Sequence, residues 1–283
     1  MYTTDVLKKR MNDGVYDAEL TRLYPAGTID AQRKRYCRVI GEFEEFYGEG
    51  REAGLFSAPG RTEIGGNHTD HNHGRVLAAS VNLDAIAVAA KSEGTVVNVK
   101  SEGYAMDTVD ISDLKPHEKE FGKSRALVRG VCSEFKRRGY NVGAFDATTA
   151  SDVLSGSGLS SSAAFEVLLG TIINHLFNDG KVSDVEIAQI AQAAENKFFG
   201  KPCGLLDQMT SSVGSFVEID FADPAKPVIE KVNFDFASCG YALCIVKATP
   251  TSPTSTPPCA MRWRALRHIS ARAFCARLMR ASL

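Results

Sequence analysis

Residues 155–164 read Ser-Gly-Ser-Gly-Leu-Ser-Ser-Ser-Ala-Ala and stand between a strand-like segment and a long apolar helical pattern. Glycine lets backbone N–H groups approach an anion closely, and a helix N-terminus adds free donors and partial positive charge. The segment lacks the Lys-Ser/Thr ending of a Walker loop, so it is not that of a P-loop NTPase. A serine-rich helix cap is the purely structural alternative. The predicted phosphate-binding loop comprises Gly156, Ser157, Gly158, Leu159, Ser160, Ser161 and Ser162.

Helical and strand-like periodicities mix along the chain without a regular βαβ repeat, which favours an α+β fold. Pro59-Gly60 is expected to end the strand 55–58, and Glu93-Gly94 to form the turn of a hairpin between strands 85–90 and 95–100. No apolar run is long enough for a transmembrane helix. Further strands are expected over 145–152, 215–221 and 241–246, and helices over 31–46 (capped by Thr28 or Asp30), 121–138, 160–177 and 185–198 (capped by Ser183).

A second polar cluster spans residues 58–74, where four glycines separate a dense set of donors and acceptors. Asn67, His68, Thr69 and Asp70 suit the vicinal hydroxyls of a sugar, because an ionised carboxylate accepts from two hydroxyls while amide and imidazole groups donate or accept. The histidines lack the usual zinc spacing, which disfavours a zinc site. Simple turn chemistry is the other alternative.

A third cluster, residues 194–209, contains Glu195 late on a helix and Asp207 at the expected start of the next. Phosphoryl transfer needs a phosphate cradle, Mg²⁺ ligands, a base and a cation for the transferring group. The Gly/Ser loop, Glu195 with a loop serine, Asp207 and Arg61 supply these parts. Each residue alone could instead be a helix cap, a solvated side chain or a surface ion pair.

Together the stretches GRTEIGGNHTDHNHG, GSGLSSSAA and CGLLDQ resemble the galactokinase family of the GHMP kinase superfamily, over roughly residues 20–246. The resemblance implies a GHMP kinase N-terminal domain over 1–220, with a galactose-binding segment at about 20–75, an ATP loop at 155–164 and a stump of the second, ferredoxin-like domain over 221–246. Many relatives carry Glu where this chain has Asn67, so the resemblance leaves sugar selectivity open.

The resemblance also implies roles for individual residues. Asp207 would take the proton from the anomeric hydroxyl, and Arg61 would stabilise the transferring phosphoryl group. Ser162 and Glu195 would bind Mg²⁺, while the loop wraps ATP. Cys203 is interpreted as a packing residue. Ser101 is expected near the nucleotide, and Gly204 joins Asn67, His68, Thr69 and Asp70 at the sugar.

The composition changes near the C-terminus. No Asp or Glu follows Asp235, whereas residues 247–283 contain seven Lys or Arg. Codons that begin on the third base of each tail codon can encode HADLTDEYAAMRDEMA from Ala248 through Arg264, a string similar to galactokinase sequence. We therefore expect a frameshift near Lys247, a non-native and disordered basic tail, and a largely missing second domain. A nucleic-acid-binding arm and an amphipathic membrane helix are the alternatives.

The resemblance implies ATP- and Mg²⁺-dependent phosphorylation of galactose at O1, with little activity expected from this chain. The alternatives are an N-acetylgalactosamine kinase or other GHMP sugar kinase, and a non-catalytic galactose- and ATP-binding regulator. Net charge near zero gives no reason to expect nucleic acid or a membrane as partner. Seven cysteines without metal-ligand spacing fit a reducing compartment, so a cytoplasmic location is expected. The expected oligomeric state is a monomer.

Overall fold

The computed structural model describes residues 1–66, 69–153, 156–223, 225–234 and 239–240. The chain divides after Phe234, and the unit Met1–Phe234 holds the elements discussed below. The expected strand 241–246 and tail 247–283 lie outside the described residues, as do Asn67 and His68. Within the described part, no helix is long and apolar enough to cross a membrane.

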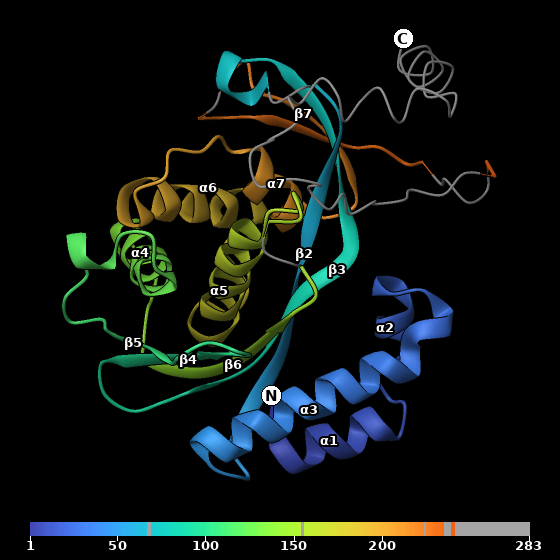
Figure 1. Ribbon diagram of the computed structural model, residues 1–283, viewed down its shortest axis with the longest axis vertical. Coiled ribbons are helices and arrows are strands. Elements are labelled where there is room, and N and C mark those ends of the chain that lie inside the picture. Colours follow the sequence, from blue (N-terminus) through green and yellow to red (C-terminus); the bar gives the residue numbers. More distant parts are fainter. Residues whose placement is uncertain (67–68, 154–155, 224, 235–238, 241–283) are drawn as a thin grey trace, which may run out of the picture. The chain divides into compact units, whose positions relative to one another are not determined.

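Eight strands within the described residues form one mixed sheet, whose order is β1-β2-β3-β6-β4-β5, with β7 and β8 continuing from β3 (Figure 1). The long strand β3 pairs with β6 through residues 85–91 and with β7 through residues 75–79. The strands are β1 Tyr2–Thr3, β2 Glu52–Gly65, β3 Arg75–Lys91, β4 Val96–Ser101, β5 Asp107–Asp110, β6 Phe145–Ser151, β7 Phe216–Asp220 and β8 Val228–Lys231.

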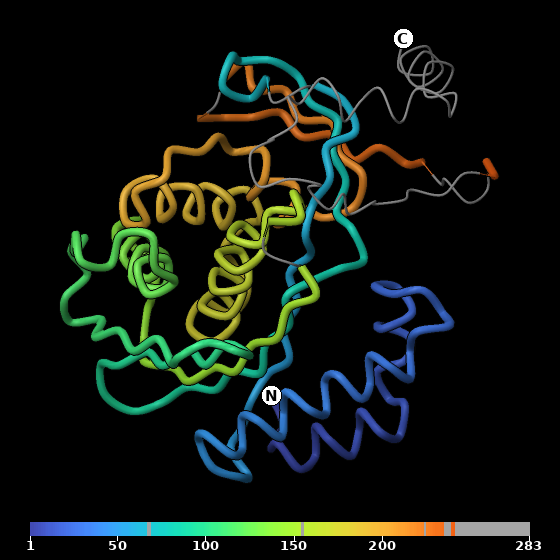
Figure 2. Tube along the Cα trace, in the orientation of Figure 1, coloured from blue at the N-terminus to red at the C-terminus, as the bar shows by residue number. Residues whose placement is uncertain are grey.

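Helices cover both faces of this sheet, with α1–α3 on one side and α4–α6 on the other (Figure 2). The side chains of β3 alternate between these two layers: Ala85, Ala87 and Ala89 face one core, and Ile86, Val88 and Ala90 face the other. The helices are α1 Thr4–Asn12, α2 Asp17–Leu23, α3 Ile29–Tyr47, α4 Ser124–Arg137, α5 Ser161–Phe177, α6 Asp184–Ala194 and α7 Leu206–Val213, with short turns η1 Ala26–Thr28, η2 Thr69–Asn72, η3 Glu118–Glu120 and π-helical η4 Glu195–Phe199.

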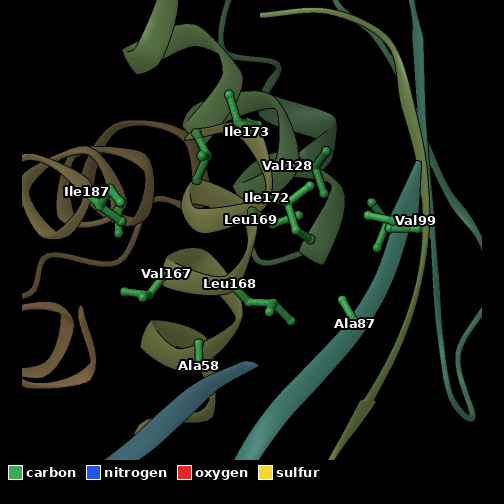
Figure 3. Packing of buried hydrophobic residues seen from close by; sticks show 14 of the residues in the cluster. Ala58, Ala87, Val99, Val128, Val167, Leu168, Leu169, Ile172, Ile173 and Ile187 are labelled. Carbon is green, nitrogen blue, oxygen red and sulfur yellow. The ribbon is translucent and has the colours of Figure 1, made fainter. Parts of the chain in front are cut away.

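Helix α5 is the centre of the larger core. Leu168, Leu169 and Ile172 pack toward the sheet at Ala87 and Val99 (Figure 3). Gly170 lets α6 approach, because a Cβ there would lie 2.8 Å from a methyl carbon of Ile187. The N-terminus of α5 is thereby fixed against the sheet at the end of the Gly/Ser loop.

The α+β class and most of the expected elements are confirmed, including the Ser183 capping box with Glu186 at the start of α6. Two expectations are wrong. Strand β2 does not end at Pro59-Gly60 but continues to Gly65, accommodating the proline at a register shift between Pro59 and Arg61. Glu93-Gly94 does not close a hairpin, since β6 lies between β3 and β4.

Two helix bounds and one helix cap also differ from the expectation. Helix α4 begins at Ser124 rather than 121, and the helix expected over 185–198 becomes the π-helical turn η4 at Glu195. Thr28 precedes α3, but its hydroxyl donates to the Pro25 carbonyl oxygen instead of capping the helix.

Candidate active site

The centre of the candidate site is an ion pair between β2 and α7. Arg61 Nε donates to Asp207 Oδ1 across 2.6 Å, although the two residues are 146 positions apart in sequence. Arg61 is only 8% exposed, whereas about a third of the Asp207 side chain is accessible. Arg61 directly follows a register shift in β2, an irregularity of the kind that re-aims side chains beside active sites.

The Gly/Ser loop is hydrogen-bonded to the Arg61 member of this pair. Arg61 Nη1 donates to the Gly158 carbonyl oxygen at 2.9 Å, and the Arg61 backbone N–H donates to the Leu159 carbonyl oxygen at 3.1 Å. The left-handed φ angles of Gly156 and Gly158, +73° and +80°, allow the loop to turn this sharply. The Leu159 side chain is buried in the core, so only its backbone belongs to the site.

A cavity of about 420 Å³ opens between the loop, the pair and η4. Most of the predicted loop and catalytic residues line it, together with two that the sequence analysis missed, Phe199 and Lys201. Ser101 does not line it; its hydroxyl accepts from Thr149 Oγ1 at 2.9 Å instead. The lining residues are Arg61, Gly156, Gly158, Ser160, Ser161, Ser162, Glu195, Phe199, Lys201 and Asp207.

Glu195 lies at the first position of η4 and points into this cavity, with three donors around its carboxylate. Ser162 Oγ and Lys201 Nζ donate to Oε1 at 3.2 and 3.3 Å, and Gln208 Nε2 donates to Oε2 at 2.8 Å. The Glu195 charge raises the pKa of Lys201. A widened π-turn often marks a functional position.

Gln208 also donates to Oε2 of Glu166, a fully buried carboxyl on α5. Burial, reinforced by the Glu195 charge, raises the pKa of Glu166 well above its usual range. Neither Glu166 nor Gln208 was singled out in the sequence; only their positions beside the loop and beside Asp207 could have suggested them.

The carboxylate of Asp70 lies close to the start of α7. Its Oδ2 accepts from the Leu206 backbone N–H at 3.3 Å, and a Cβ on Gly204 would lie 1.8 Å from that oxygen. The other oxygen, Oδ1, is buried and has no hydrogen-bond partner within the described residues. A buried carboxylate oxygen with unused acceptor capacity suits a ligand hydroxyl.

Two neighbouring residues named in the sequence analysis, Thr69 and Cys203, have contacts within the structure. Thr69 donates to the Arg75 carbonyl oxygen at 3.1 Å and so closes its own loop. Cys203 is half-buried, and burial raises the pKa of its thiol, which agrees with a packing role. Within the described residues, which do not include His68, no group of three or more His, Cys, Asp or Glu side chains is arranged to hold a metal.

A glycine- and serine-rich loop at a helix N-terminus, joined to an Arg–carboxylate pair on an α+β scaffold, is the arrangement expected of the N-terminal domain of a GHMP kinase. Residues 126–215 match the family "GHMP kinases N terminal domain". The mevalonate kinase of Methanococcus jannaschii shares the fold, with a TM-score of 0.54 over 66% of this chain at 15% identity.

Within that class the matches of the chain are to galactokinases. The galactokinase galactose-binding signature matches residues 41–91. Galactokinases of Clostridium tetani and Streptomyces coelicolor are 37% and 33% identical over 61% and 74% of this chain. The solved Lactococcus lactis galactokinase, complexed with galactose, aligns with a TM-score of 0.63 at 28% identity, over 69% of this chain and 51% of that one. The chain spans about half the length of these curated relatives, 44% and 54%.

Proposed function

We propose that this chain carries the galactose- and ATP-binding half of a galactokinase, which transfers the γ-phosphoryl group of ATP to O1 of galactose. The observation that carries the proposal is the Arg61–Asp207 pair, which joins the Gly/Ser loop and lies on the same cavity. A proton acceptor beside a phosphate cradle is what phosphoryl transfer to a hydroxyl requires.

In this proposal Asp207 accepts the proton of the sugar hydroxyl while Arg61 pairs with its carboxylate and faces the developing charge. Asp70 accepts from sugar hydroxyls through Oδ1, which has no hydrogen-bond partner within the described residues. Leu206 and Gly204 contact the other oxygen, Oδ2, and so fix the position of Asp70 relative to Asp207. Asn67, His68 and Thr69 complete the sugar site. The relative from Lactococcus lactis, solved with galactose, supports this choice of substrate.

Residues 156–162 would wrap the phosphates of ATP. The donor set fits Mg²⁺, because Ser162 Oγ and Glu195 Oε1 lie 3.2 Å apart on the cavity and offer hard oxygen ligands. Bound there with the phosphates, Mg²⁺ would neutralise charge on the transferring group. Lys201 adds a second positive charge to the same wall.

Calorimetric titration of the 283-residue chain with galactose and with ATP tests the two binding functions, and a coupled assay tests transfer. We expect measurable binding and turnover well below the roughly 1–100 s⁻¹ typical of kinases, because the 283 residues span about half the length of the relatives they match. Loss of both binding isotherms would contradict the proposal.

Competition between galactose and N-acetylgalactosamine distinguishes the first alternative. A frame-restored chain that binds both ligands without transferring phosphate would support the non-catalytic regulator instead. Sedimentation of the purified chain tests the expected monomer, and fractionation of the producing cell tests the expected cytoplasmic location.

A further inference from the structure

The hydroxyl of Ser160 points at the candidate base. Ser160 Oγ donates to Asp207 Oδ2, while Arg61 Nε donates to Oδ1. The two oxygens of the carboxylate are thus held from two different elements, β2 and the Gly/Ser loop. Sequence reasoning assigned Ser160 to the phosphates only, since nothing in the sequence links it to a residue 47 positions away.

Three consecutive loop residues contact the Arg61–Asp207 pair. Gly158 and Leu159 accept from Arg61 through their carbonyl oxygens, and Ser160 donates to Asp207. A Cβ on Gly60 would lie 3.1 Å from the Leu159 oxygen, so strand and loop are in close contact. A displacement of the loop therefore reaches Asp207 directly.

Ser160 also has an unusual backbone. Its φ and ψ are 59° and 62°, a left-handed conformation that disfavours residues with a Cβ, and no cap hydrogen bond from its side chain compensates. Such backbone strain persists where the surrounding structure fixes it, and it gathers at functional sites. The conformation directs the hydroxyl to Asp207 instead of to the first turn of α5.

We propose that Ser160 is a positioning residue that transmits occupancy of the nucleotide loop to Asp207, so that nucleotide and sugar binding are coupled through its hydroxyl. This inference rests on the proposed function. Phosphate oxygens bound on the loop compete with Asp207 for the Ser160 hydroxyl. When that hydroxyl donates to a phosphate instead, Asp207 Oδ2 has one donor fewer. The sugar hydroxyl then finds an accepting position there, so nucleotide raises sugar affinity.

The test measures the dissociation constant of galactose by calorimetry with and without saturating Mg²⁺ and the non-hydrolysable β,γ-imido analogue of ATP. In the unaltered chain we expect the analogue to tighten galactose binding by at least about fivefold, the lower range of site–site coupling. In Ser160→Gly the tightening should fall below about twofold. Glycine suits the left-handed backbone, so this variant should melt no lower than the parent chain.

Ser161→Ala is the matched control, since it removes the adjacent hydroxyl from the same cavity wall. It should weaken analogue binding yet keep the coupling ratio. Ser160→Ala should lose the coupling like the glycine variant while retaining the strained backbone. Undiminished coupling in Ser160→Gly, or absent coupling in a parent chain that binds both ligands, overturns the inference alone; a parent chain that binds neither overturns the proposed function as well.

Discussion

Arg61 and Asp207 meet across 2.6 Å although β2 and α7 carry them at distant points of the chain. Arg61 is buried and also donates to the Gly158 carbonyl oxygen, so the guanidinium ties the candidate base to the loop. The pair is therefore both a structural link and the proposed catalytic centre, and variants can separate these roles.

Asp207→Ala should destabilise the chain by about 1–3 kcal/mol, because it leaves the Arg61 charge buried with one acceptor fewer; partial exposure of Asp207 keeps the cost below that of a fully buried pair. Asp207→Asn retains an acceptor oxygen, so it should cost less and still bind both ligands, but it removes the proton acceptor. Urea unfolding and calorimetry measure these effects. Equal stability of Asp207→Ala and the parent chain would contradict the first expectation.

Gly204→Ala should lose galactose affinity selectively. The added Cβ would lie 1.8 Å from Asp70 Oδ2, so the carboxylate must move, at a cost of about 1–3 kcal/mol in stability. Nucleotide affinity should change little. Gly139→Ala is the control, since its φ of +86° imposes strain without any contact near the site; a similar loss of galactose binding there would refute the steric explanation.

Glu166→Gln should alter the pH dependence of stability. The folded-state pKa of Glu166 lies well above 4.5 because of burial, so the folded chain binds more protons than the unfolded chain above that pH. Its stabilising contribution is complete below about pH 4.5 and is lost as pH rises toward the folded pKa, by up to about 1.4 kcal/mol per pH unit. The glutamine variant lacks this loss. Urea unfolding from pH 5 to 8 should show the two stabilities diverging; parallel curves would exclude a buried neutral Glu166.

Lys201→Met should weaken ATP binding on the order of tenfold, or about 1.4 kcal/mol, because it removes a positive charge from the cavity wall while keeping the apolar stem. The loss should shrink at high salt. Lys197→Met is the matched control, since Lys197 pairs with Glu134 and does not line the cavity. Equal affinities for the two variants would remove Lys201 from the phosphate site.

The tail prediction concerns the coding DNA. If the frame shifts near Lys247, restoring it should yield an acid-containing continuation similar to galactokinases in place of the arginine-rich residues 247–283. Sequencing the source DNA and expressing the restored chain measure this. An intact frame with no galactokinase-like reading in another frame would refute the frameshift, and the basic tail would then need another explanation.

Local sequence predicted the site's parts because each depends on neighbouring residues. Gly156 and Gly158 supply the left-handed turns of the loop, and the Ser183 capping box starts α6. The failures arose where distant pairing overrode local signals. Pro59-Gly60 is a turn signal, yet β2 continues through it because β3 pairs with it on both sides of the register shift. Glu93-Gly94 does not form a hairpin turn, because β6 lies between β3 and β4 and pairs with both.

The sequence by itself determined the class of site: a loop of glycines and hydroxyls, an acidic base, a cation and a polar sugar segment, in a recognisable order. Only the tertiary structure decided that Ser160 faces Asp207 and that Lys201 joins Ser162 at Glu195. The physical reason is the separation in sequence over which each kind of interaction acts. Turn and cap preferences act within a few residues, whereas these contacts exist because the packed core fixes where β2, α5 and α7 end relative to one another.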